Sequence, residues 1–116
     1  MKFSVNREAL LRPLTIVAGA VERRQTMPIL SNLLIIASGN KLVITGTDLE
    51  VELSATIILD DAAETNGDIT VPARKFVDIC KSLPDSCDIS FSLEQGKAVV
   101  KSGRSRYTLA TLAAAD

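Results

Sequence analysis

The chain has 116 residues, of which 47% are hydrophobic and 23% are charged, with a net charge of −1 and no histidine. This composition is typical of one globular domain, and no apolar run approaches the roughly 20 residues that a membrane-spanning helix requires. Without histidine, the Ser–His hydrolase arrangement and Cys–His nucleophiles are excluded, and Cys80 and Cys87 form no CxxC pair for zinc. The N-terminus lacks the apolar stretch of a signal peptide, so we expect a cytoplasmic protein.

The first half of the chain predicts a strand, a helix and three further strands. Residues 2–6 alternate apolar and polar side chains, and Asn6 is a good N-cap for a helix over 7–21 with apolar positions at helical spacing. Pro13 falls inside this helix and is expected to kink it. The three strands are expected at residues 29–38, 41–48 and 51–59.

The second half repeats this plan. A strand at 68–72 ends in a proline and leads into a helix over 73–83, and the last three strands are expected at 87–93, 97–103 and 105–112. Apolar positions of the two halves match at a constant spacing, as Phe3 and Val5 do with Ile69 and Val71, 66 positions later. The sequence therefore predicts a two-layer α+β domain with a duplicated β-α-β-β-β repeat. Its two helices would pack on one face of a mostly antiparallel sheet.

The second helix carries two cations where carboxylates are usual. In "GDITVPARKFVDICKSLP", Arg74 and Lys75 fall in the first helical turn, where the helix dipole disfavours each cation by about 0.3–1 kcal/mol. An ion pair from Arg74 to Asp78 would offset only about 0.2–0.5 kcal/mol of this cost. A polyanion or an acidic protein surface outside the helix would explain both residues. The predicted outward faces of the two helices also carry Arg12 and Lys81, with Arg23 and Arg24 where the first helix ends.

Two other segments allow alternative sites. Asp48, Glu50 and Glu52 alternate along a strand and could hold magnesium, although a solvated strand face explains them as well and no phosphate loop accompanies them. The segment "KSGRSRYTL" places arginines before a strand that bears Tyr107. If this last strand is a sheet edge, it could pair with another chain, or its charges could prevent such pairing.

Four stretches, "TVPARKFVDICKSLP", "TMPILSNLL", "TGTDLEVE" and "SGRSRYTLATL", resemble the first domain of the bacterial DNA polymerase III beta subunit, the sliding-clamp family, in order and spacing. The resemblance covers essentially the entire chain. It implies a ring of two subunits joined head to tail, each with three such domains, with helices lining the central hole. It also implies a protein without chemistry of its own, which encircles duplex DNA and keeps the replicative polymerase on it.

The resemblance also assigns residues by position. DNA contact through phosphates is implied for Arg24 and Arg74, and we add the neighbouring cations Arg23, Arg12 and Lys81 on the expected helix surface. Contact with the neighbouring subunit is implied for Lys75, Lys97, Arg104, Arg106, Tyr107 and Leu109, the last two in an apolar patch. No metal and no cofactor are implied.

The chain differs from the family in its length. It stops at Asp116, after what would be the first of three domains, so the surfaces for the partner subunit, the polymerase and the clamp loader would lie outside it. We therefore expect residues 1–116 to be one clamp domain, with internal repeats at about 1–60 and 67–116. The alternatives from other classes are a free-standing protein-interaction domain that pairs through its last strand, and a magnesium-dependent enzyme.

Overall fold

A computed structural model describes residues 1–19, 32–47 and 52–111 of the chain. The order of elements is strand, helix and three strands, and then the same order again. The elements are β1 (Lys2–Asn6), α1 (Arg7–Ala18), β2 (Asn32–Ser38), β3 (Lys41–Thr47), β4 (Glu52–Ile58), β5 (Gly67–Pro72), α2 (Ala73–Ser82), β6 (Asp88–Glu94), β7 (Lys97–Ser102) and β8 (Ser105–Ala110). The duplicated repeat predicted from the sequence is confirmed. Helix α1 is continuous through Pro13 and ends at the Gly19 cap, and the rest of its expected range lies outside the described residues.

The eight strands divide into two four-stranded antiparallel sheets, in the orders β1-β6-β7-β8 and β4-β3-β2-β5. The sequence predicted mostly antiparallel strands, which is confirmed, but it did not predict this division. Each sheet takes one edge strand from the other half of the chain. Strand β1 pairs with β6, so that Phe3 lies opposite Phe91, and strand β5 pairs with β2, so that Ile69 lies opposite Ile35.

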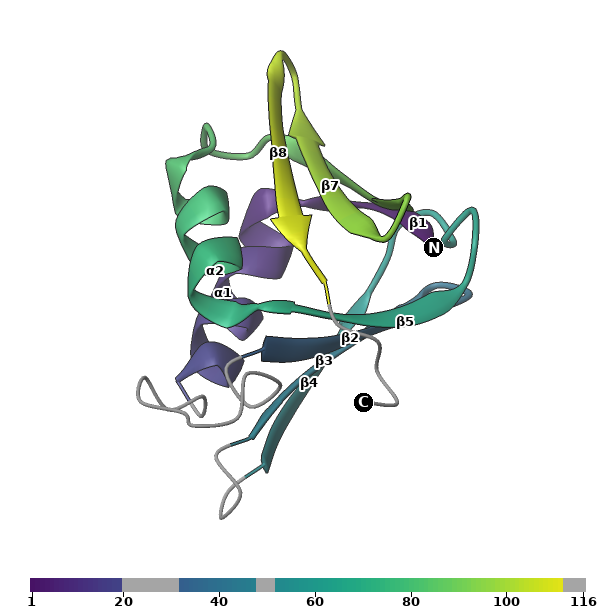
Figure 1. Ribbon diagram of the computed structural model, residues 1–116, viewed down its shortest axis with the longest axis vertical. Helices are drawn as coiled ribbons and strands as arrows, with labels where there is room; N and C mark the ends of the chain where they lie inside the picture. Colours follow the sequence, from purple (N-terminus) through teal and green to yellow (C-terminus); the bar gives the residue numbers. More distant parts are fainter. Residues whose placement is uncertain (20–31, 48–51, 112–116) are drawn as a thin grey trace.

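Both helices lie side by side on one side of the molecule, and the strands lie on the other (Figure 1). Helix α1 packs on β3 and β4, whereas α2 contacts β5 and β8. The core between helices and sheets contains all three phenylalanines of the chain: Phe3 stacks on Phe91 at a centroid distance of 5.0 Å, and Phe76 meets Phe91 at 5.8 Å. Burial of aromatic side chains against one another stabilises the packing of α2 on the sheet that contains β1 and β6.

One hairpin turn places a candidate site residue. Strands β7 and β8 are joined by Gly103 and Arg104, and Gly103 has a φ of +56°. A glycine with positive φ at the first central position is the signature of a type II′ turn, which suits the twist of a two-residue hairpin. Arg104 is therefore held at the tip of the hairpin and is exposed there.

Candidate nucleic-acid interface

The two helices differ at their N-termini. In α1, the Asn6 side chain accepts a hydrogen bond from the Glu8 backbone N–H at 3.0 Å, and Glu8 places a carboxylate in the first turn. In α2, the N-cap is Pro72, which makes no side-chain cap, and the first turn contains no acid. The start of α1 is thus the usual arrangement for a helix, whereas the start of α2 leaves its partial positive charge uncompensated.

Arg74 and Lys75 lie exposed at this uncompensated end of α2. The ion pair that spacing allows between Arg74 and Asp78 is not formed; within the described part of the chain the ion pairs join other residues. An arginine N-terminal to its acid is also the weaker orientation for a pair four residues apart. The cations are therefore not explained by pairing within the helix, and both are available to an external anion.

The structure describes only some of the remaining predicted DNA-binding residues. Arg12 on α1 and Lys81 in the last turn of α2 are exposed, and their helices form the same layer (Figure 1). Arg23 and Arg24 lie outside the described residues. The helix layer therefore carries three exposed candidates for phosphate contact, namely Arg12, Arg74 and Lys81.

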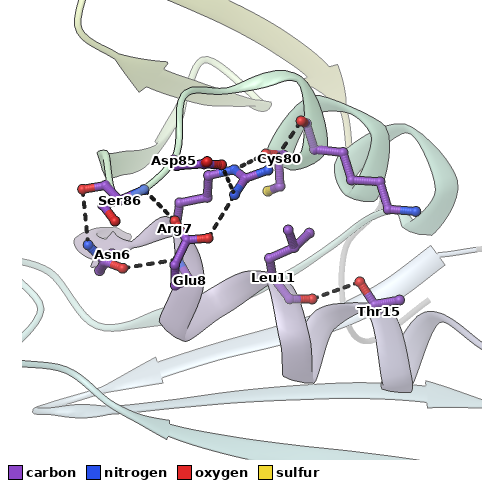
Figure 2. A network of polar contacts seen from close by, with 9 residues as sticks. Asn6, Arg7, Glu8, Leu11, Thr15, Cys80, Asp85 and Ser86 are labelled. Carbon is purple, nitrogen blue, oxygen red and sulfur yellow. Dashed lines mark hydrogen bonds and ion pairs between the residues drawn. The ribbon is translucent and has the colours of Figure 1, made fainter.

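A buried cation that the sequence did not reveal lies between the helices. Arg7, the first residue of α1, has only 11% of its side chain exposed, and its guanidinium reaches the end of α2. Its Nε donates to the Cys80 carbonyl at 2.9 Å and its Nη2 donates to the Lys81 carbonyl at 3.3 Å (Figure 2). The start of α1 therefore lies beside the end of α2, so the helices are antiparallel. A cation at the C-terminal end of a helix also complements its dipole.

The same guanidinium organises the loop that follows α2. Its Nη1 contacts the carboxylates of Glu8 at 2.7 Å and Asp85 at 3.1 Å. Glu8 in turn accepts a hydrogen bond from the Ser86 backbone N–H, and the Asn6 amide donates to the Ser86 carbonyl at 3.3 Å. Ser86 has a φ of +59°, an uncommon conformation for a residue with a side chain, and these contacts hold it there. We call Asn6, Arg7, Glu8, Asp85 and Ser86 the helix latch.

Cys80 is fully buried beneath this latch. Burial raises the pKa of its thiol from the ordinary value of 9.0 to about 12, with the Arg7 charge lowering it and Cys87 raising it further. The thiol is therefore neutral at physiological pH and behaves as a small apolar side chain.

The predicted subunit-interface residues on the last hairpin lie on both of its faces. Strand β8 is a sheet edge, and Tyr107 lies opposite Val100, on the face that packs toward the core. Arg106 lies opposite Lys101, which places it on the other face, because successive side chains of a strand alternate. Lys97 lies at the open end of the hairpin, on the inner strand β7, and Arg104 lies at its tip, so the cations are spread along the length of the hairpin.

Leu109 differs from its expected place. It is 4% exposed and belongs to the hydrophobic core, whereas we expected it in an apolar surface patch. Strand alternation explains this difference, since Leu109 shares the core-facing side of β8 with Tyr107. Tyr107 is half-buried, and its hydroxyl lies 3.4 Å from the Ser82 hydroxyl at the end of α2.

The alternative metal site is not assembled in the described residues. No group of three His, Cys, Asp or Glu side chains that could hold a metal ion occurs within them. Glu52 is exposed on β4, whereas Asp48 and Glu50 lie outside the described residues. Leu53, the next residue of β4, is 38% exposed.

Two antiparallel sheets on one side of a pair of helices, in a duplicated order and with exposed cations on the helix layer, define a DNA-clamp domain. The chain belongs to the family of the DNA polymerase III beta subunit, N-terminal domain, whose sequence model matches residues 1–116. It is 60% identical to the beta sliding clamp of Pseudomonas aeruginosa and 51% identical to that of Escherichia coli, over 100% of this chain and 31% of each relative.

The comparison with solved structures identifies the same family as the comparison with related sequences. A crystal structure of the DNA polymerase III subunit beta from Pseudomonas aeruginosa matches with a TM-score of 0.96 at 58% identity, and the beta subunit from Caulobacter crescentus with a TM-score of 0.95 at 40% identity. Each match covers 100% of this chain and 31% of the other. The chain therefore spans about a third of the length of these relatives. None of the described helices has the length and apolar character needed to cross a membrane.

Proposed function

We propose that this chain is the N-terminal domain of a ring-shaped sliding clamp, a non-catalytic protein that encircles duplex DNA and gives the replicative polymerase its processivity. The observation that carries the proposal is the helix layer, which presents Arg12, Arg74 and Lys81 exposed and without a carboxylate partner among the described residues. The length of the chain, 31% of its relatives, agrees with one domain of three.

The proposed contact with DNA is electrostatic and not specific for sequence. Exposed arginine and lysine side chains bind phosphates without reading base edges, and each contact makes affinity depend on salt. Contacts of this kind let a protein slide, because each base-pair step presents the same charges. The proposed contact set is completed by Arg23 and Arg24, which follow α1 in the sequence.

The proposed second surface is the β8 edge, which would join the neighbouring subunit head to tail. An edge strand offers unpaired backbone groups to another chain, and exposed cations along it favour an acidic partner. The residues that we assign to this surface are Lys75, Lys97, Arg104, Arg106, Tyr107 and Leu109, although the side chain of Leu109 is buried in this domain. The polymerase and the clamp loader would bind to parts of the full-length cytoplasmic protein beyond this chain.

The proposal is tested by topology. The full-length protein is loaded on circular duplex DNA, and its retention is measured before and after one linearising cut. Enclosure predicts that the protein is retained on the circle and lost after the cut, whereas equal retention would mean ordinary affinity binding and would overturn the clamp mechanism.

Individual contacts are tested on the 116-residue chain with a short fluorescent duplex at low ionic strength. Arg74→Ala is expected to lower the slope of log affinity against log salt by about 0.9, the value for one phosphate contact on duplex DNA. Lys41→Ala is the matched control, because Lys41 is an exposed cation on strand β3 and not on the helix layer. An unchanged slope for Arg74→Ala removes this residue from the phosphate contacts.

The free β8 edge also supports a second candidate, a protein-interaction domain that pairs its last strand with an acidic ligand. Binding of an acidic protein without any binding of duplex DNA would favour this candidate over the clamp. Stabilisation by magnesium would instead favour a metal site at Asp48, Glu50 and Glu52.

A further inference from the structure

The buried guanidinium of Arg7 controls a carboxylate on the helix surface. Glu8 and Arg12 are four residues apart on α1, so they lie on the same face, with the acid N-terminal to the cation. This is the favourable orientation for an ion pair. Arg12 nevertheless takes part in none of the ion pairs among the described residues.

Both oxygens of Glu8 are engaged elsewhere. Oε2 lies 2.7 Å from Nη1 of Arg7, and Oε1 accepts the hydrogen bond from the Ser86 backbone N–H. Figure 2 shows the carboxylate of Glu8 directed to Arg7 and to the loop after α2. Glu8 is therefore held at the helix latch and does not reach along α1 to Arg12.

The preference for Arg7 over Arg12 has a physical cause. The side chain of Arg7 is 11% exposed and already fixed by the carbonyls of α2, so its pair with Glu8 is screened little and costs little additional side-chain entropy. A pair between Glu8 and the exposed Arg12 would be screened by solvent and would have to immobilise a free side chain. The ion pair between Glu8 and Arg7 is therefore favoured over an ion pair between Glu8 and Arg12.

The second helix has no counterpart of this arrangement. At the positions equivalent to Arg7 and Glu8, 66 residues later, α2 has the buried Ala73 and the exposed Arg74. The equivalent of Arg12 is Asp78. In α2 the first turn thus presents a cation directly, whereas in α1 the first turn contains an acid that must be held away from the next cation.

We infer that Arg7 is a positioning residue of the nucleic-acid interface: by holding the carboxylate of Glu8 in the helix latch, it keeps Arg12 free to bind a DNA phosphate. The inference rests on the proposed function, because it needs DNA at the helix layer. If Arg7 is removed, Glu8 is released and pairs with Arg12, so Arg12 no longer contributes a free positive charge.

The test is a mutant cycle in the 116-residue chain. For each variant we would measure the slope of log affinity against log salt for a short fluorescent duplex. Arg12→Gln is expected to lower the slope by about 0.9 in the native background and by close to zero in the Arg7→Met background. Adding Glu8→Gln to Arg7→Met is expected to restore the dependence on Arg12. A purely structural role of Arg7 would not produce this restoration, because Glu8→Gln returns none of the contacts that Arg7 makes with α2.

The possible results distinguish a failure of the role of Arg7 from a failure of the proposed phosphate contact. If Arg12→Gln lowers the slope equally with and without Arg7, the phosphate contact stands and the role of Arg7 is overturned. If Arg12→Gln leaves the native slope unchanged, both the contact of Arg12 and the inference are overturned. Lys41→Gln serves as the charge-matched control and is expected to have little effect in every background.

A second experiment leaves the buried Arg7 unchanged. It is used if circular dichroism shows that Arg7→Met does not fold. Glu8→Gln alone changes an exposed carboxylate that is already held by the latch. The effect of Arg12→Gln on the slope is then expected to be the same with and without Glu8→Gln. An effect of Arg12→Gln that grows when Glu8 is neutralised would show that Glu8 pairs with Arg12 in solution, and this result would overturn the inference.

Discussion

Arg7 and Cys80 show how burial changes the role of individual side chains. Arg7 is one cation among several in the sequence, but it lies between the two helices and satisfies two carbonyls at the end of α2. An unsatisfied buried carbonyl would cost about 1–3 kcal/mol, so the hydrogen bonds of Arg7 fix the relative position of the helices. The sequence held one signal for this role, a cation at a position that the helix periodicity places on the buried side, but nothing in it identified the carbonyls.

Cys80 makes the free energy of unfolding depend on alkaline pH. Its thiol has a pKa of about 12 in the folded chain and an ordinary value of 9.0, so the folded state retains the proton between these values. This contribution to stability is complete below pH 9.0 and is lost as the pH rises from 9.0 towards 12.

We therefore expect the stability difference between the native chain and Cys80→Ala to shrink as the pH is raised above 9.0. Urea denaturation of both proteins at pH values below and above 9.0 measures this difference, and groups that titrate equally in both proteins cancel. A difference that stays constant with pH would contradict the raised pKa of Cys80.

At the scale of elements, α2 carries cations where a helix start is usually stabilised by a cap side chain and an acid. Its first turn has no cap side chain and no acid, although its buried face, with Phe76 and Cys80, is an ordinary helix face. The helix is stabilised by packing against the core and by the latch at its other end. This explains how two cations persist at the positive end of the dipole.

Arg74→Glu is expected to stabilise the chain by about 0.6–2 kcal/mol at low ionic strength, because it removes a cation that the dipole of α2 disfavours and adds a carboxylate that the dipole favours. Repulsion between the new carboxylate and Asp78, four residues later, reduces this gain by about 0.2–0.5 kcal/mol. The gain should decrease in high salt, where exposed charges are screened. Thermal or urea unfolding measures it, and the same variant is expected to bind duplex DNA more weakly. Lys41→Glu, on strand β3, is the control with the same change of charge; an equal stabilisation there would show a general charge effect and not the dipole.

At the scale of the whole molecule, the two repeats are joined by exchange of their first strands. Strand β1 closes the sheet of β6, β7 and β8, and strand β5 closes the sheet of β2, β3 and β4. Neither half of the chain can complete a four-stranded sheet from its own strands in this topology. The two repeats can therefore be recognised separately in the sequence, but only both repeats together form the complete fold.

We expect the separate halves, residues 1–61 and 62–116, to remain largely unfolded alone and to form the native fold when mixed. Each half would expose the apolar face of a three-stranded sheet and the unpaired edge that the missing strand covers. Circular dichroism and amide hydrogen exchange of each half and of the mixture measure this. Two independently folded halves would contradict the importance of strand exchange.

The sequence by itself determined the helices and strands, their duplication and the family, because periodicity, caps and motifs are local and survive without knowledge of packing. It also identified Arg12, Arg74 and Lys81 as surface cations, since helix periodicity is enough to place them on a face. It did not determine the partition of eight strands into two sheets, since strand pairing joins residues far apart in the chain.

Only the tertiary structure revealed the burial of Leu109 and the contacts of Arg7. Both depend on which element packs above a given side chain: β8 turns Leu109 towards the core, and the end of α2 lies over the start of α1. The free energy of such contacts comes from removing groups from water and satisfying their hydrogen bonds, and that requires partners from distant parts of the chain. For this reason the local pattern predicted which faces of the helices and strands are charged or apolar, and the packing decided which of those charges are unpaired among the described residues.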